Sequence, residues 1–358
     1  MMIPRIGYAF IVSLIVLTVS CGEKSADNSG DNIDQAAVGA LQKPELLVYS
    51  ARKEHLIKPL FDQFTEQTGI VVNYVTDKEG PLLARLKAEG ESSPADILMT
   101  VDAGNLWQAS QLGVLAPLTS TVLADNVPAH LRDPNNRWFA LTIRARTIVY
   151  STANIAPDDL STYEALADTE WRDRLCLRTS KKVYNQSLVA TMIAALGEER
   201  AEAVVAGWVA NLALEPFSND TMVMEAIASE QCDAGIVNTY YYGRLMNKNS
   251  QLPLALFWPN QQGEGADGRG VHINVSGAGV TLASRHKPEA QQLIEWLSSP
   301  AAQTLLMDLN QEYPVNPSVV LNTELASWGT FVADDINVGE AGRLQAKAVK
   351  LMDRVGYR

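Results

Sequence analysis

Residues 46–74 read LLVYSARKEHLIKPLFDQFTEQTGIVVNY, and this stretch contains the unit that decides the fold. Its apolar start predicts a strand, and the apolar residues from Leu56 to Phe64 then recur at helical spacing. Gly69 is placed to end that helix, and the apolar run after it predicts a second strand. Strand, helix and strand in this order are typical of an open α/β sheet.

The same alternation continues on both sides of a long extended segment at 138–150, and a second extended segment at 273–280 is placed to return the chain to its first half. Further strands are predicted at 96–99, 175–178 and 233–237, and helices at 81–89, 106–112, 187–196, 199–212, 222–230, 288–297 and 300–309. Ligands of open α/β sheets bind at the carboxyl ends of strands, and hinged lobes close around them. The predicted fold class is therefore α/β, with two α/β lobes and a hinged inter-lobe cleft.

The crossings between the lobes give the predicted boundaries. The first lobe comprises 44–142 and 277–318, and the second lobe comprises 143–276. A C-terminal helical segment at 319–358 is expected to pack on the lobes.

The length and charge of the chain limit its class. The chain has 358 residues and a formal net charge of -12. This length suits two domains, or one large one, with an ample core. The sequence contains no basic stripe of the kind that nucleic-acid binders carry, so no nucleic-acid partner is expected.

The N-terminus predicts export. Arg5 precedes a short apolar run at 11–19, and Ser20 and Cys21 follow it. A basic start, a short apolar stretch and a small residue describe a signal peptide at 1–20. Cys21 is typical of a lipidated cysteine, although an ordinary signal peptide followed by a chance cysteine is the alternative. The polar and small residues at 21–43 predict a flexible tether between the lipid and a body outside the cytoplasm.

Two further cysteines, Cys176 and Cys232, lie beside predicted strands. In an oxidising compartment such a pair is a candidate disulfide. The alternative is two unpaired buried thiols.

A cluster of tyrosines at 240–242 is the candidate binding site. Residues 238–243 read NTYYYG and follow a short apolar run that predicts a strand. Asn238 or Thr239 can cap a helix, which would place Tyr240 and Tyr241 at its N-terminus, where negative charge is favoured. This predicts that the site favours phenolate over phenol.

A phenol becomes a good ligand when a strong cation displaces its proton, since its ordinary pKa is about 10. Ferric ion is the best match, because it is hard and three phenolates balance its charge. A third phenol is available from Tyr184, which lies between a predicted strand and a helix. Taken alone, a tyrosine in this position is more often a packed aromatic residue than a ligand.

At this point the sequence resembles a family, the periplasmic ferric-ion-binding proteins of bacterial ABC importers, from about Leu46 to Pro317. The motifs that carry the resemblance are VYSARKE at 48–54, PADIL at 94–98, RARTIVY at 144–150, VYNQSL at 183–188, GIVNTYY at 235–241, HINVSGAG at 272–279 and EYPVNP at 312–317. The resemblance implies a type II periplasmic binding protein fold and iron(III) bound by Tyr184, Tyr240 and Tyr241. Tyr242 falls outside the paired tyrosines of the family, and a structural role is expected for it.

The sequence departs from the family at the first-lobe ligands. Some members use a histidine and a glutamate where this chain has Lys53 and Val101. Others use a tyrosine where this chain has Glu54, which makes the Glu54 carboxylate a candidate metal ligand. His55 is the competing candidate.

Three phenolates leave coordination positions free on a six-coordinate ion, and in the family an anion such as carbonate often fills them. Arginine suits bidentate oxyanions. The candidates for the anion site are Arg144 first, Arg52 second and Arg146 third. The alternative is that these arginines form salt bridges across the hinge.

The resemblance further implies a periplasmic, lipid-anchored monomer that delivers iron to the permease and ATPase subunits of an ABC importer in the inner membrane, and that is not an enzyme. A binding protein for an organic solute, such as a polyamine, thiamine or a sugar, is the alternative. An enzyme with a tyrosine acid/base is a third possibility, but no nucleophile and base pattern supports it.

Overall fold

The computed structural model describes residues 44–263 and 265–358. The predicted signal peptide, the tether and Cys21 lie outside the described residues and stay predictions. Within the described residues, no helix is long and apolar enough to cross a membrane.

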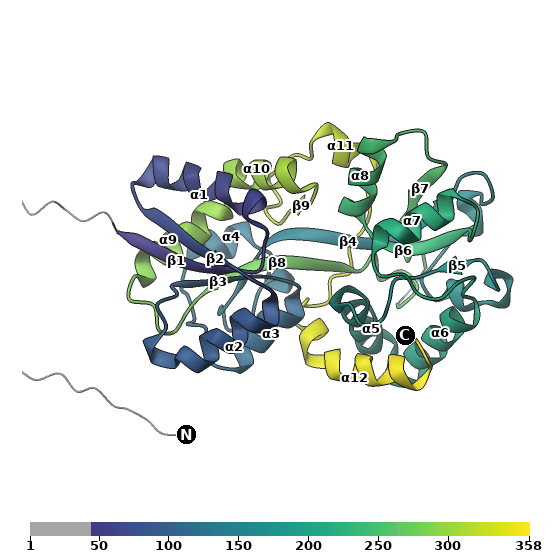
Figure 1. Ribbon diagram of the computed structural model, residues 1–358, viewed down its shortest axis with the longest axis horizontal. Helices are drawn as coiled ribbons and strands as arrows, with labels where there is room; N and C mark the ends of the chain where they lie inside the picture. Colours follow the sequence, from purple (N-terminus) through teal and green to yellow (C-terminus); the bar gives the residue numbers. More distant parts are fainter. Residues whose placement is uncertain (1–43, 264) are drawn as a thin grey trace, which may run out of the picture. The chain divides into compact units, whose positions relative to one another are not determined.

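The first lobe is the α/β unit that the opening stretch predicts (Figure 1). Its elements are β1 (Glu45–Ser50), α1 (Glu54–Thr68), β2 (Val71–Thr76), α2 (Glu79–Glu89), β3 (Ile97–Val101), α3 (Ala103–Gln111) and α4 (Thr121–Asn126). β1 pairs in parallel with both β2 and β3. Gly69 ends α1 in the left-handed conformation, as predicted.

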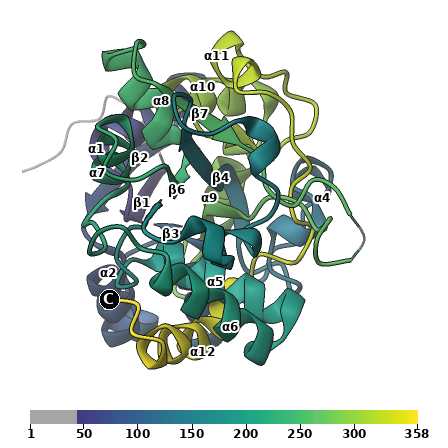
Figure 2. The same ribbon diagram turned by 90° about the vertical axis from the view of Figure 1, so that its right-hand side faces the viewer.

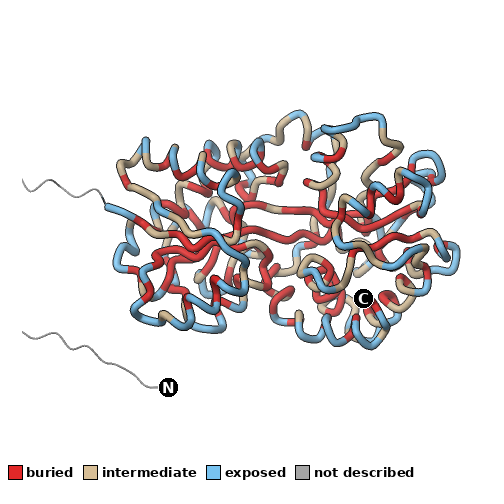
Figure 3. Tube along the Cα trace, in the orientation of Figure 1, coloured by how far each residue is buried: buried red, intermediate tan, exposed pale blue. Residues whose placement is uncertain are grey.

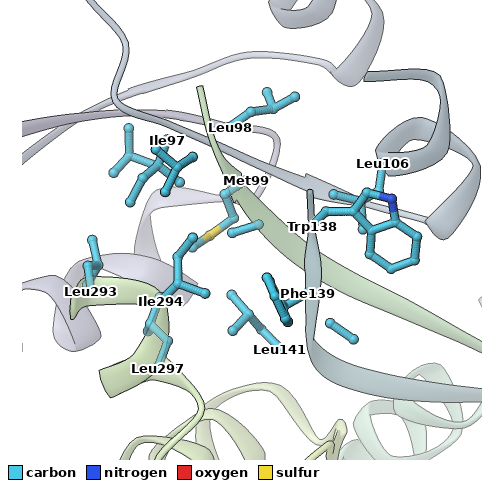
Figure 4. Close-up of a cluster of buried hydrophobic side chains, with 14 of the residues drawn as sticks. Ile97, Leu98, Met99, Leu106, Trp138, Phe139, Leu141, Leu293, Ile294 and Leu297 are labelled. Carbon is cyan, nitrogen blue, oxygen red and sulfur yellow. The ribbon is translucent and has the colours of Figure 1, made fainter. Parts of the chain in front are cut away.

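The core of this lobe lies between its sheet and the helices returned from the C-terminal part of the chain (Figure 4). Ile97 and Met99 of β3 contribute to it with Phe139. Leu293 and Ile294 join the same core from α9 (Lys287–Leu297). The neighbouring helix is α10 (Pro300–Asn310).

The second lobe repeats the α/β pattern around a separate core. Its elements are β5 (Leu175–Cys176), α5 (Val183–Leu196), α6 (Glu198–Ala210), α7 (Asp220–Ala228), β6 (Ala234–Asn238), α8 (Thr239–Lys248) and β7 (Leu254–Phe257). α5 begins at residue 183 and not at 187 as predicted, so Tyr184 lies in its first turn. Cys176 and Cys232 form a disulfide with an S–S distance of 2.01 Å, which ties β5 to the turn before β6.

Two long strands connect the lobes, β4 (Phe139–Ser151) and β8 (Ile273–Val280). β4 pairs with β8 and with β9 (Tyr313–Pro314) up to Ala145, and from Arg146 it pairs with β6 and β7. Both strands are buried where they pass between the lobes (Figure 3). Ile273 and Val275 of β8 pack in the core of the first lobe. This core therefore includes residues that precede 277, where the first lobe was predicted to resume.

Within the described residues, nine strands form one mixed sheet in the order β2-β1-β3-β8-β4-β6-β5, with β7 and β9 paired to β4. The chain ends in α11 (Thr323–Ser327) and α12 (Glu340–Arg354). α12 packs on α5 and α6 of the second lobe (Figure 2) and also on α3 of the first. The C-terminal helix therefore contacts both lobes.

Candidate functional site

Charged and aromatic side chains gather where strands end. Arg52 lies two residues beyond β1, and Arg178 lies two residues beyond β5. Asp102 directly follows β3, and Tyr240 and Tyr241 follow β6 in the first turn of α8. This is the position at which open α/β sheets bind ligands.

The three predicted tyrosines lie together. The rings of Tyr240 and Tyr241 have centroids 4.4 Å apart and are tilted by 36°. Tyr184 reaches the same place from α5, because the guanidinium of Arg178 lies 5.1 Å from its ring centroid and 5.9 Å from that of Tyr241. Two segments more than fifty residues apart thus bring three phenols to one point.

Tyr242 differs from its neighbours. Its phenol oxygen donates to the carbonyl of Leu254 at 3.4 Å, and its ring packs edge-on against Trp328. The structural role predicted for Tyr242 is confirmed by these contacts.

The pKa values of Tyr240 and Tyr184 are shifted in the direction opposite to the prediction. Burial raises the pKa of Tyr240 well above 10, and the neighbouring Tyr184 and Tyr241 raise it further. Burial also raises the pKa of Tyr184, against the lowering effect of Arg144. The expectation that the helix N-terminus favours phenolate is therefore wrong for the metal-free protein, since loss of water and mutual repulsion outweigh the helix dipole.

Asn238 takes the N-cap position of α8, but its side chain does not cap the helix. Its Oδ1 accepts a hydrogen bond from Arg146 at 3.2 Å, and its Nδ2 donates to the phenol oxygen of Tyr240 at 3.3 Å. Asn238 therefore orients Tyr240 directly.

Arg144, the first candidate for the anion site, lies beside the tyrosines. It is buried on β4, one residue before the changeover between lobes, and its guanidinium lies 5.5 Å from the ring centroid of Tyr184. Its Nη2 donates to the carbonyl of Val275 at 2.9 Å. Its Nε has no hydrogen-bond partner among the described residues, so a donor remains for a ligand beside the tyrosines.

Arg52 is engaged in a buried ion pair. Its Nη1 donates to Glu312 at 3.0 Å and also to the hydroxyl of Ser276. Burial would raise the pKa of Glu312, but the charges of Arg52 and Arg144 hold it below its usual range. This salt bridge lies within the first lobe and not across the hinge, and the Nε of Arg52 also lacks a partner in the described part of the chain.

Arg146 is not free to bind an anion, and the prediction for it is corrected. It makes five hydrogen bonds, to Asn185, Asp220, Asn238 and the carbonyl of Ile236. A guanidinium has five N–H donors, so none remains. The sequence alone could not show this, because the alternation of side chains along β4 does not identify the residues that form hydrogen bonds with Arg146.

Glu54 and His55 are exposed in the first turn of α1. The Glu54 carboxylate accepts a hydrogen bond from the phenol of Tyr74 at 2.9 Å. The contacts of the described residues do not join either side chain to the three tyrosines.

Sequence reasoning missed two arginines, Arg178 and Arg244. The guanidinium of Arg244 lies 4.9 Å from the ring centroid of Tyr240. Arg178 was detectable, because it stands as far beyond β5 as Arg52 stands beyond β1. Arg244 was also detectable, because it lies one helical turn after Tyr240. Glu312 lies in a motif that the family resemblance contained, but its pairing with Arg52 needed the fold.

Another contact joins the lobes near the tyrosines. The buried carboxylate of Asp102 accepts hydrogen bonds from the hydroxyl of Ser187 and from Asn274, each at 2.8 Å. Ser187 lies one turn after Tyr184 in α5. The first lobe therefore contacts the helix that carries a predicted ligand.

In the part of the chain that the structure describes, His, Cys, Asp and Glu side chains do not form a group of three or more that could hold a metal ion. Two α/β lobes with an oxygen-rich cluster between them define a solute-binding protein of the type II periplasmic fold.

The chain belongs to the family of bacterial extracellular solute-binding proteins, whose family model matches residues 59–333. It is 40% identical to iron uptake protein A1 of Synechocystis over 99% of this chain and 97% of that protein. The structure of a Trichodesmium protein (IdiA or FutA) in complex with iron and citrate superposes with a TM-score of 0.84 at 40% identity, covering 88% of this chain and all of that one.

Apo FutA2 of Synechocystis gives a TM-score of 0.83 at 39% identity, with 88% of this chain and 100% of that chain covered. The predicted resemblance to periplasmic ferric-ion-binding proteins and the predicted fold class are confirmed by these comparisons.

Proposed function

We propose that this protein captures ferric ion through the phenolate oxygens of Tyr184, Tyr240 and Tyr241 and delivers it to an ABC permease. The observation that carries the proposal is the gathering of three phenols beside the buried guanidinium groups of Arg144 and Arg178. Aromatic side chains that only pack do not need buried cations over two of their rings.

The charge of the ion follows from the protonation state of the site. Burial raises the pKa values of Tyr184 and Tyr240, which keeps these two phenols protonated in the metal-free protein. When three phenols bind a trivalent ion, three protons leave and three positive charges arrive. The buried site gains no net charge, whereas a divalent ion with the same ligands would leave one uncompensated negative charge. This favours iron(III) as the cargo.

The free donor of Arg144 supports a companion oxyanion on the same ion, with Arg52 as a second cation at the first-lobe side. Carbonate has the size and charge for a bidentate guanidinium contact. Citrate is the competing anion, since it accompanies iron in the related Trichodesmium structure. The proposed metal ligands are the three tyrosines, and Glu54 remains a candidate from the first lobe.

The proposed setting is the periplasm. Lipid attachment at Cys21 would hold the body near the membrane, and the permease and ATPase subunits would take up the released ion. The relatives that are iron-binding and iron-uptake proteins support a transport role and not an enzymatic one.

A visible spectrum tests the proposal. Metal-free protein titrated with a ferric salt should develop the strong colour of ferric phenolate. The double variant Tyr240→Phe/Tyr241→Phe should stay colourless, while Tyr242→Phe, which alters a packed neighbour, should colour like the wild type. A colourless wild type, or colour that survives in the double variant, would refute the ferric-tyrosinate site. Thermal stabilisation by a polyamine, thiamine or sugar instead of iron would favour the organic-solute alternative.

A further inference from the structure

A buried polar network lies behind the tyrosines in the second lobe and centres on Asp220. This residue is the first of α7 and is fully buried. Its Oδ1 accepts a hydrogen bond from Nη1 of Arg178 at 3.2 Å. Its Oδ2 accepts from Nη1 of Arg146 at 3.1 Å and from the backbone N–H of Asn238 at 3.0 Å. One carboxylate thus connects the segment after β5, the middle of β4 and the end of β6.

Arg146 extends the network to both tyrosine-bearing segments. Its Nε and Nη2 both donate to Oδ1 of Asn185, at 3.0 and 2.6 Å, and its Nη1 also donates to Oδ1 of Asn238. Asn185 directly follows Tyr184 in the chain, and Asn238 donates to the phenol oxygen of Tyr240. One guanidinium therefore fixes the distance between the start of α5 and the start of α8.

Tyr357, the second-to-last residue of the given sequence, makes hydrogen bonds to the segment between Arg178 and Asn185. Its buried phenol donates to the carbonyl of Arg178 at 2.6 Å and accepts from Nδ2 of Asn185 at 2.8 Å. The turn that carries Arg178 and leads to Tyr184 is therefore held at both ends.

We propose that Asp220 and Arg146 are positioning residues of the iron site. They set the spacing of the three phenols before the ion arrives, and Asp220 holds the Arg178 charge over the rings of Tyr184 and Tyr241. This inference rests on the proposed function. Three phenol side chains do not hold one another at the spacing that one ion requires, so this spacing must come from the groups around them. Neither positioning residue is a ligand.

The test replaces the Asp220 carboxylate by an amide of the same shape. Asp220→Asn leaves Arg146 and Arg178 without their shared counter-ion and changes the position of Arg178 over the rings. We expect ferric affinity, measured by competition with citrate, to fall about 10- to 100-fold, as for other residues that orient metal ligands. We also expect the ferric phenolate band to shift in wavelength, which a loss of fold stability alone would not cause.

The control is Glu164→Gln. It neutralises a partly buried carboxylate in the same lobe, which pairs with Arg269 and accepts a hydrogen bond from Asn260. This variant should keep the wild-type band and affinity. If Glu164→Gln shifts the band as much as Asp220→Asn does, the effect is not specific to the network and the inference fails.

A second variant decides the question if Asp220→Asn does not fold. Tyr357→Phe keeps the ring and removes only the hydroxyl that joins Arg178 to Asn185. We expect a smaller band shift in the same direction and an affinity loss of about fivefold, since the two hydrogen bonds that are lost are uncharged. A wild type without any ferric band would overturn the proposed function. A wild type with the band, and folded variants with unchanged band and affinity, would overturn this inference alone.

Discussion

The two lobes contribute to the site in different ways. The second lobe supplies the three tyrosines and Arg178, and a buried network within that lobe holds them. The first lobe supplies the ion pair of Arg52 and Glu312. The proposed ligands and the network that supports them thus lie in one lobe, whereas the other lobe provides a buried ion pair. Changes in the second lobe should therefore abolish binding, and changes in the first should only modulate it.

The largest expected effect is that of pH, because it acts on every phenol at once. The pKa values of Tyr184 and Tyr240 are raised, so these phenols are protonated throughout the range below pH 10, and iron must displace their protons. Affinity should rise with pH and fall on acidification, by up to about 1000-fold per pH unit if three protons are released. Ferric occupancy measured against citrate from about pH 8 to about pH 4 checks the slope. Constant binding over that range would contradict a phenolate site.

Much of this comparison was predictable from sequence. The alternation of strands and helices predicted the lobes, because apolar periodicity reports local burial. The family motifs predicted Tyr184, which its own neighbourhood left ambiguous. α5 begins at residue 183, four residues before the predicted start. The prediction missed this first turn because its residues Asn185 and Gln186 are polar and interrupt the apolar pattern.

What the sequence could not predict are the partners of the arginines. Arg144 and Arg146 lie two residues apart on one strand and are both buried, yet Arg144 keeps a free donor beside the tyrosines and Arg146 keeps none. Their difference is decided by Asp220 and Asn185, which are far away in the chain. Likewise, the raised phenol pKa values depend on packing in three dimensions and reverse the expectation from the helix dipole alone.

Loss of the disulfide should give the second-largest effect, on stability. Cys176 and Cys232 tie β5 to the turn before β6, the two strands whose ends carry Arg178 and Tyr240, and the first lobe has no cysteine. Replacing both cysteines by alanine should lower the free energy of unfolding by about 4 kcal/mol, within the usual range for native disulfides. Denaturant unfolding monitored by circular dichroism measures this loss. If the second lobe depends on the bond as we expect, iron should recover part of the stability, since a ligand stabilises the state it binds.

Tyr184→Phe tests the link between the two tyrosine-bearing segments. It removes one phenol oxygen and keeps the ring under Arg144 and Arg178. We expect a loss of ferric affinity of about 100-fold, and the slope of affinity against pH should fall by about one proton. Both quantities come from the same citrate competition. A variant with weakened affinity but an unchanged slope would mean that Tyr184 packs beside the ion without losing its proton.

Arg144 and Arg52 form a matched pair for the anion. Arg144→Gln removes the cation that has a free Nε beside Tyr184, and Arg52→Gln removes the one that is paired with Glu312. We expect iron affinity in the presence of carbonate to fall about tenfold for Arg144→Gln, as for loss of one charge-assisted hydrogen bond, and less for Arg52→Gln. In buffer free of carbonate and citrate, the difference between Arg144→Gln and the wild type should vanish. If it persists, the arginine acts on the phenolates and not through an anion.

The smallest effect is expected at Glu54, on the first-lobe side. Its carboxylate is exposed and accepts a hydrogen bond from Tyr74, and that bond is the main reason why the pKa of Tyr74 is raised. Glu54→Gln keeps an acceptor for Tyr74 and removes the charge, so iron affinity should change by about threefold or less, the range of an exposed charge. His55→Gln tests the competing candidate in the same turn and should change it no more. A loss of tenfold or more in Glu54→Gln, with a shifted ferric band, would show that the first lobe supplies a ligand when iron is bound, and the contrast between the lobes would then hold only for the metal-free protein.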